Sequence, residues 1–193
     1  MVDYKVVLGL LAIIISLIGY IPYFRDIFSG KTKPHAFSWF VWSVITGIGF
    51  GIQFTEKGGA GSWVTGFTAV ICTVIFVLAL FKGKRSFPLT DWAALVAALM
   101  ALVLWLVAKQ PVASVLLITA TDAIAFVPTF RKAYHHPHED TAITFGLNGL
   151  KFFISLFALE SWTLTTWLYP MSLIISNWAF TLMMYIRRKQ LAR

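Results

Sequence analysis

Seven apolar runs, each about long enough to cross a bilayer as a helix, constrain this chain more than any other feature. A helix that spans the hydrocarbon needs about 20 mostly apolar residues. The runs lie at residues 5–28, 36–54, 61–81, 90–108, 111–130, 141–159 and 164–186. Of the 193 residues, 59% are hydrophobic and 12% are charged, which excludes an ordinary soluble domain. We therefore predict an all-α integral membrane protein with seven transmembrane helices.

The basic residues are unevenly distributed over the loops that would join these helices. The loops after the first, third and fifth helices and the C-terminal tail carry twelve lysines and arginines, whereas the other side carries three. The positive-inside rule then predicts a multi-pass protein of the inner (plasma) membrane, with its N-terminus outside and its C-terminus in the cytoplasm. This topology accounts for most of the net charge of +8, so we expect no nucleic acid as a partner.

One stretch of the sequence occurs twice. GYIPYFRDIFSGKTKPHAFSW, residues 19–39, aligns without a gap with AFVPTFRKAYHHPHEDTAITF, residues 125–145, at an offset of 106 residues. In both copies an aromatic residue precedes a Val/Ile-Pro step, a basic turn follows, and a new apolar run begins. The offset matches Pro22 with Pro128 and Arg25 with Arg131. Such an ordered set of matches indicates an internal repeat.

The repeat divides the chain into three parts. Residues 1–81 form a first three-helix repeat, residues 82–110 a linker helix, and residues 111–193 a second repeat with a basic tail. Three spans reverse the direction of the chain, so a fourth is needed before the second repeat can start on the same side as the first. Two parallel triplets then face each other across a pseudo-twofold axis, and we expect a site between them near the midplane.

This 3+1+3 arrangement, with a proline near the cytoplasmic end of the first helix of each triplet, resembles the PQ-loop superfamily, which includes the SWEET sugar transporters. The resemblance covers essentially the whole chain. The family's Pro-Gln pair is replaced here by Pro22-Tyr23 and by Pro128-Thr129. The architecture is similar to that of PnuC vitamin transporters and of the KDEL receptor as well, so the fold alone does not choose a substrate.

Pro22 and Pro128 are the candidate hinges. A proline inside a helix removes one backbone hydrogen bond and crowds the preceding turn, so the helix kinks or bends there. The resemblance to PQ-loop transporters implies that these two prolines let their helices bend during alternating access. A static kink near a helix end is the alternative.

Asp122 and Lys151 are charged residues within predicted spans, where charges are rare and mark functional candidates. Each lies about 14 Å from the cytoplasmic end of its helix, at 1.5 Å per residue. If consecutive antiparallel helices are neighbours, the two side chains form an ion pair. One reading of that pair is a buried contact that fixes helix packing. The other is a proton- or substrate-sensitive switch, in which neutralising Asp122 releases Lys151.

Three further residues complete the predicted substrate-binding set. Asn177 lies at nearly the depth of Asp122, and its amide both donates and accepts hydrogen bonds. SWEET transporters resemble this chain in having an asparagine on their seventh helix. Asn148 lies one turn from Lys151, and its repeat partner Trp42 is expected to face the axis with it. An interhelical hydrogen bond is the alternative role for Asn148.

Two other motifs contain residue types that can bind metals or phosphate. The loop with His135, His136, His138, Glu139 and Asp140 has several metal-ligand types, but its short spacing, interrupted by a proline, argues against a preformed metal site. The run TGIGFG, residues 46–51, lies within a span and indicates close helix packing rather than a nucleotide loop. No serine, histidine and acid arrangement suggests catalysis. We expect no enzyme, no cofactor and no bound metal.

These observations lead to one predicted function and one alternative. The prediction is a transporter of a small polar solute, sugar-like or vitamin-like, that works by alternating access between the two triplets, with passive or proton-linked transport both open. The alternative is a receptor with the same fold that binds its ligand without transport. The expected partners are the solute and the lipid bilayer, with self-association into a homo-oligomer as a further option.

Overall fold

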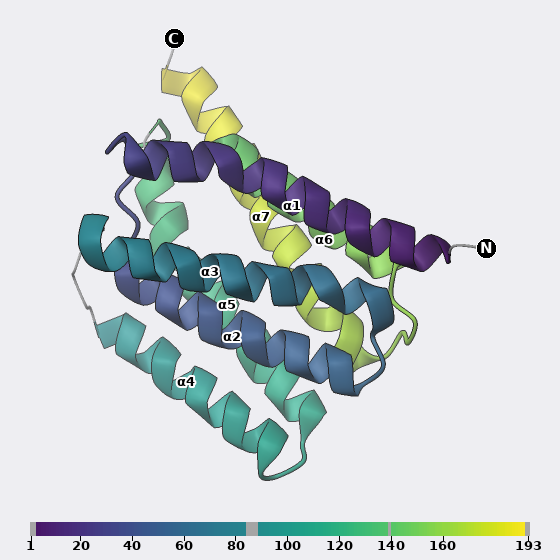
Figure 1. Ribbon diagram of the computed structural model, residues 1–193. Helices are drawn as coiled ribbons and strands as arrows, with labels where there is room; N and C mark the ends of the chain where they lie inside the picture. The colour runs from purple at the N-terminus through teal and green to yellow at the C-terminus, as the bar shows by residue number, and fades with distance from the viewer. Residues whose placement is uncertain (1–2, 84–88, 139, 192–193) are drawn as a thin grey trace.

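The computed structural model describes residues 3–83, 89–138 and 140–191. Within them the chain forms seven α-helices, one short 3-10 helix and no strand (Figure 1). The elements are α1 Tyr4–Phe28, α2 Ala36–Thr55, η1 Gly59–Ser62, α3 Trp63–Lys82, α4 Leu89–Leu106, α5 Pro111–His135, α6 Ala142–Phe157 and α7 Leu164–Leu191. The all-α prediction is confirmed, and each apolar run of the sequence corresponds to one helix.

Among the described residues, four helical segments are long and apolar enough to cross a membrane. They are Tyr4–Phe28, Ala36–Thr55, Gly59–Lys82 and Pro111–His135. Two further apolar segments, Leu95–Leu106 and Ala142–Phe157, are shorter. The 16 residues of α6 give about 24 Å of helix, somewhat less than the hydrocarbon thickness of about 30 Å. By the length and composition of its helices, the chain is a helical membrane protein.

Local chemistry explains where several helices begin. α1 starts after Asp3, whose carboxylate accepts the backbone N–H of Lys5 at 3.0 Å and so caps the helix. α2 starts after His35, whose ring Nδ1 accepts the backbone N–H of Ser38. α5 starts at Pro111, a position where the missing N–H of proline costs no helical hydrogen bond.

The order of the helices in space differs from their order in the chain. α3 packs against both α1 and α2, and α7 packs against both α5 and α6. α1 also packs along α6, as Figure 1 shows, and α5 packs along α2. α4 contacts α5 and α2 at one edge of the bundle. Helices that follow each other in the chain are therefore not always neighbours.

The contacts among the six helices other than α4 occur in matched pairs. The pair α1 and α3 corresponds to α5 and α7, and the pair α2 and α3 corresponds to α6 and α7. Between the two groups, α1 with α6 corresponds to α5 with α2, and α3 with α6 corresponds to α7 with α2. The first residues of α2 and α6, Ala36 and Ala142, are separated by the same 106 residues as the repeated stretch.

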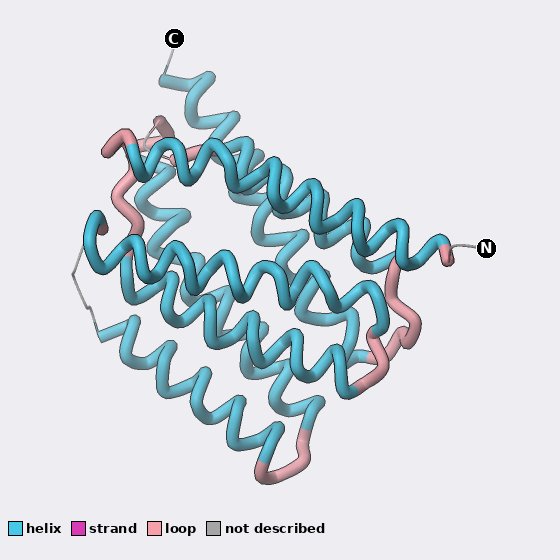
Figure 2. The backbone as a smooth tube through the Cα atoms, viewed as in Figure 1, coloured by secondary structure: helices cyan, strands magenta, loops and turns pink. Residues whose placement is uncertain are grey.

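The described helix ends and loops gather at two opposite ends of the bundle, with the two termini at opposite ends (Figures 1 and 2). One end holds the loop between α1 and α2, the loop between α5 and α6, and the last turn of α7; we call it the basic end. The other end holds the turn between α2 and α3 and the turn between α6 and α7. An odd number of helices along one axis produces this arrangement.

The outer face of α1 is apolar and exposed along its length. Val7, Ile14, Ile18 and Ile21 are each at least half exposed. An exposed apolar face of this length is unfavourable in water and favourable against lipid acyl chains. The surface therefore agrees with a membrane-embedded protein.

Candidate functional site

A cavity lies inside the bundle and draws its walls from six of the seven helices; we call it the central cavity. The lining residues are Tyr20, Trp39, Trp42, Thr46, Thr68, Cys72, Asp122, Phe126, Phe145, Asn148, Phe152, Leu173 and Asn177. Most of them are buried. The centre of a water molecule can move through about 50 Å³ of it, which is room for about four waters.

Four of the five residues that the sequence predicted for binding line this cavity. They are Trp42, Asp122, Asn148 and Asn177, which come from α2, α5, α6 and α7. Trp42 and Asn148 are repeat partners, and both face the same space, as the repeat predicted. Whether these residues bind a solute stays a prediction, but the structure brings them together.

Asp122 is an acid without an evident partner. Its side chain is 2% exposed, and its Oδ2 has no hydrogen-bond partner among the described residues. Phe126 lies four residues further along α5, on the same helix face, and also lines the cavity. The carboxylate and the phenyl ring therefore form adjacent parts of one wall.

The expected ion pair between Asp122 and Lys151 is absent from the structure, so that prediction is wrong. The Nζ of Lys151 donates instead to Ser16 Oγ at 3.0 Å and to Thr68 Oγ1 at 2.9 Å. It also lies 4.7 Å from the centre of the Tyr20 ring. In the described part of the chain the one ion pair recorded joins Arg25 to Asp26. A switch that works by breaking an Asp122–Lys151 pair therefore has no pair to break.

Helix order is the reason for this difference. The prediction assumed that α5 and α6, consecutive in the chain, are neighbours in space. The structure places α7 against both of them and packs α6 along α1 instead. Lys151 on α6 therefore points to Ser16 on α1, which is the residue that the repeat matches with Asp122. Lys151 itself does not line the cavity, although its partners Thr68 and Tyr20 do.

The two asparagines and the tryptophan differ in how their polar atoms are used. Asn177 donates its side-chain Nδ2 to the backbone oxygen of Leu173 at 2.8 Å, within its own helix. Trp42 packs against Phe126 at 5.7 Å between ring centres, and its Nε1 has no hydrogen-bond partner among the described residues. Two residues of the cavity wall, Trp42 and Asp122, thus each have a buried polar atom, one donor and one acceptor, without a hydrogen-bond partner among the described residues.

The 106-residue offset also relates lining residues that are not in the predicted binding set. Besides Trp42 and Asn148, three further pairs 106 residues apart line the cavity: Tyr20 with Phe126, Trp39 with Phe145, and Thr46 with Phe152. The first two pairs lie inside the repeated stretches themselves. A pseudo-twofold axis through the cavity places such pairs opposite each other. These lining residues could therefore have been predicted from the repeat. Thr68 and Cys72 could not have been predicted in this way, because the residues 106 positions after them are not among the lining residues described.

Of the predicted hinges, Pro22 lies inside α1, which remains helical for six residues beyond it to Phe28. Pro128 lies within the bounds of α5, but its side chain is outside the part of the chain that the structure describes. Pro170 lies inside α7 and was not singled out from the sequence, although a proline in a predicted span was visible there. Bending at these prolines stays a prediction.

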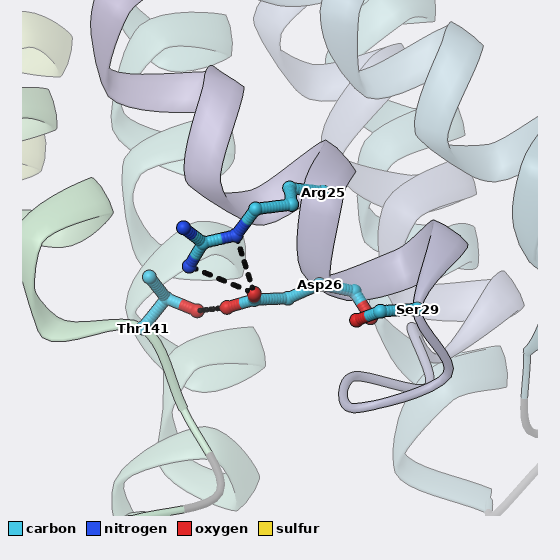
Figure 3. Close-up of polar contacts among 4 residues, drawn as sticks. All are labelled: Arg25, Asp26, Ser29 and Thr141. Carbon is cyan, nitrogen blue, oxygen red and sulfur yellow. Dashed lines mark hydrogen bonds and ion pairs between the residues drawn. The ribbon is translucent and has the colours of Figure 1, made fainter.

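A hydrogen bond between helices of different triplets crosses the basic end. Thr141, the residue before α6, donates its Oγ1 to Asp26 Oδ2 at the end of α1, at 3.0 Å. Asp26 Oδ1 accepts from the guanidinium of Arg25 at 3.1 Å, so the aspartate lies between its two partners (Figure 3). Because Arg25 is largely exposed, water weakens the ion pair. The bond to Thr141 links the two triplets at this end.

More contacts of this kind occur at the opposite end. The buried Gln53 on α2 donates its Nε2 to the backbone oxygen of Thr166 on α7 at 2.7 Å. Two backbone hydrogen bonds also join the turns, from Gly61 to Ala158 at 3.0 Å and from Glu160 to Gly58 at 3.2 Å. Hydrogen bonds between the triplets thus occur at both ends of the bundle.

The histidine loop does not form an evident metal site. His135, His136 and His138 are all exposed, and no group of three or more suitable ligands comes together among the described residues. Glu139, the fourth predicted candidate, lies outside those residues. A second cavity of about 300 Å³ at the basic end includes His138, Asp26 and Arg188 in its walls.

Comparisons with known proteins do not assign a family or a function to the chain. No protein-family model, no curated protein and no solved structure matches the chain. The function must therefore be argued from the cavity and from the repeat.

Proposed function

We propose that the chain is a transporter of a small polar solute that works by alternating access, with a fold of the PQ-loop and SWEET type. The observation that carries the proposal is the central cavity, because repeat-related residues from both halves of the chain form its wall. Transporters built from parallel repeats bind their substrate near the midplane between the repeats. None of the lining residues described comes from the linker α4.

The matched helix contacts support the division into two triplets. Every substantial contact among the six helices outside α4 has a counterpart under the exchange of α1, α2 and α3 with α5, α6 and α7. Two triplets with the same internal packing can rock as rigid units about the shared cavity. The domains 1–81, 82–110 and 111–193 predicted from the sequence follow this division.

The proposed topology has all seven helices crossing the membrane. Four of them are long and apolar enough by themselves; α4 and α6, whose apolar segments are shorter, and the more polar α7 would cross as parts of the bundle. The basic residues of the α1–α2 and α5–α6 loops and of the α7 end lie at one end of the bundle. The positive-inside rule assigns that end to the cytoplasm and the N-terminus to the outside.

This conformation has little room for a solute. The cavity has room for about four waters, and hydrogen bonds between the triplets bridge both of its ends. A solute larger than this enters when one end opens and the cavity widens. In this proposal Pro22 and Pro128 are the points where α1 and α5 bend.

Solute flux in proteoliposomes tests the proposal. The purified protein is screened against sugars, amines, amino acids, nucleosides and vitamins by thermal shift, and the solutes that stabilise it are used for counterflow. We expect accumulation of labelled solute that Trp42→Ala abolishes and that Thr73→Val, an exposed position on α3, leaves unchanged. Binding without counterflow would support the receptor alternative and reject transport.

A further inference from the structure

A buried acid is part of the wall of the central cavity. Asp122 and Lys151 are the two buried charged side chains in the described part of the chain. Asp122 lines the cavity, and its buried Oδ2 has no partner among the described residues, whereas Lys151 is not part of the lining. A buried carboxylate left unpaired is costly, and a partner that supplies a positive charge or a strong donor relieves that cost.

Lys151 is not that partner, because its ammonium group is satisfied elsewhere. Ser16 and Thr68 accept its hydrogen bonds, and the rings of Tyr20 and Phe152 lie 4.7 Å and 5.0 Å from its Nζ. The ammonium group of Lys151 therefore contacts hydroxyl groups and aromatic rings, and Lys151 is not among the residues that line the cavity. The charged group exposed to the cavity itself is acidic.

The rest of the wall suits a cation with an apolar body. Phe126 follows Asp122 by one turn of α5, and Trp42 packs on Phe126 from α2. The wall also includes Tyr20, Trp39 and Phe145. Cations lie favourably over aromatic ring faces, and tryptophan is the best of them, so aromatic walls with a carboxylate recognise alkylammonium groups. The Lys151 ammonium already lies against two rings of this same wall, Tyr20 and Phe152.

From these contacts we propose that the solute carries an ammonium group, from primary to quaternary, which binds Asp122 and is covered by the rings of Trp42 and Phe126. This inference rests on the proposed function, because it names the substrate class of the same cavity. The present cavity volume limits the solute to a few non-hydrogen atoms beyond the ammonium group, unless the triplets move apart. The same ammonium chemistry occurs in simple amines and in zwitterions such as amino acids.

A matched set of ligands tests the proposed ammonium specificity on the wild-type protein. Binding to the wild-type protein is measured by calorimetry for choline, for the uncharged carbon isostere of choline, and for glycine betaine. We expect choline to bind at least about tenfold more tightly than its isostere, because the two differ in charge but hardly in shape. Tighter binding of choline than of betaine identifies a simple amine as the source, and the reverse identifies a zwitterion. Equal binding of choline and the isostere, or no binding of any of the three, would overturn the proposal.

A pair of variants then assigns the charge to Asp122. We expect Asp122→Asn to lower choline affinity at least about tenfold, and Glu160→Gln, which removes an exposed acid at the far end, to leave it unchanged. If Asp122→Asn does not fold, protection of the single cysteine, Cys72, replaces it. Cys72 lines the same cavity, so choline and not its isostere should slow its reaction with a thiol reagent. Unchanged affinity in Asp122→Asn, or equal protection by both ligands, would contradict the assignment.

The two proposals fail in different ways. Counterflow of a sugar together with no binding of ammonium compounds rejects this inference and leaves the transporter in place. Tight choline binding without counterflow keeps the ammonium site and rejects transport.

Discussion

Lys151 is a buried lysine held by hydroxyl groups and aromatic rings instead of a carboxylate. Its two acceptors come from different helices, Ser16 on α1 and Thr68 on α3, while Lys151 lies on α6. Thr68 also donates its own hydroxyl to the backbone oxygen of Val64 at 2.6 Å, which orients its lone pairs toward the ammonium group. The side chain therefore joins three helices, two from the first triplet and one from the second.

A set of substitutions tests this network at the level of single residues. Removing both acceptors, as Ser16→Ala with Thr68→Val, leaves the ammonium group buried without hydrogen bonds, and we expect a loss of about 3 kcal/mol of stability. Lys151→Met removes the charge and keeps much of the volume, so it should cost less. Adding Lys151→Met to the double variant should restore part of the loss. Thermal or denaturant unfolding in detergent measures all four proteins, and a triple variant less stable than the double variant would refute the network.

At the scale of helices, glycines set how closely α2 approaches its neighbours. A Cβ at Gly49 would lie 2.7 Å from the ring of Tyr169 on α7, and Tyr169 is fully buried. A Cβ at Gly51 would meet the Trp105 ring of α4. Gly47, on the same helix, has no atom within 4 Å of such a position. The glycine run thus permits close helix packing, as the sequence indicated. Gly49 and Gly51 make such close contacts, and Gly47 does not.

Gly47 and Gly49 form a matched pair for testing this packing. We expect Gly49→Ala to destabilise the protein by about 1–3 kcal/mol, because the Tyr169 ring has no free space to move into. Gly47→Ala should be neutral or should stabilise α2 by up to about 1 kcal/mol, since alanine favours the helix. The midpoints of thermal unfolding in detergent give both values. Equal effects of the two substitutions would exclude the close contact with α7.

At the scale of the whole molecule, different bonds join the triplets at the two ends of the bundle. In the described part of the chain, a side-chain hydrogen bond from Thr141 to Asp26 is recorded at the basic end, whereas backbone bonds and the buried Gln53 join the triplets at the other. A single hydrogen bond contributes about 0.5–1.5 kcal/mol. Removing the Thr141 bond should therefore make the basic end open more readily.

Cys72 reports this opening because it is the single cysteine and lines the cavity. Thr141→Val keeps the shape of the side chain but removes the donor, so we expect Cys72 to react about 2–10 times faster with a charged thiol reagent. The reagent should act from the side that carries the basic end. Ser29→Ala, which affects a hydroxyl bonded to the Asp26 backbone, is the control and should change nothing. No acceleration in Thr141→Val would argue that this contact does not hold the cavity closed.

The orientation in the membrane is a second prediction for the whole molecule. With seven spans, reporters fused to the two termini must lie on opposite sides. We expect a C-terminal fluorescent protein to fold in the cytoplasm and an N-terminal periplasmic reporter to be active outside. Both termini on one side would exclude seven spans and the parallel triplets with them.

The sequence by itself determined the helices, most of their bounds and the repeat. These depend on local properties: the length of each apolar run, the prolines, and residue types that recur at a fixed offset. The same information placed Asp122 and Asn177 at nearly the same depth, because position along a helix follows from residue number. Their convergence on one cavity agreed with that depth.

The partner of each buried charge was decided by the tertiary structure alone. Depth is a property of one helix, but an ion pair or hydrogen bond depends on which two helices are neighbours and which faces they present. Because α7 packs between α5 and α6, Asp122 and Lys151 at similar depths do not meet. Lys151 reaches Ser16 and Thr68 instead, and Asp122 is left to the cavity. Asp122, on which the proposed ammonium site depends, has no basic partner among the described residues because of which helices are neighbours in space. The order of the helices in the chain did not indicate this.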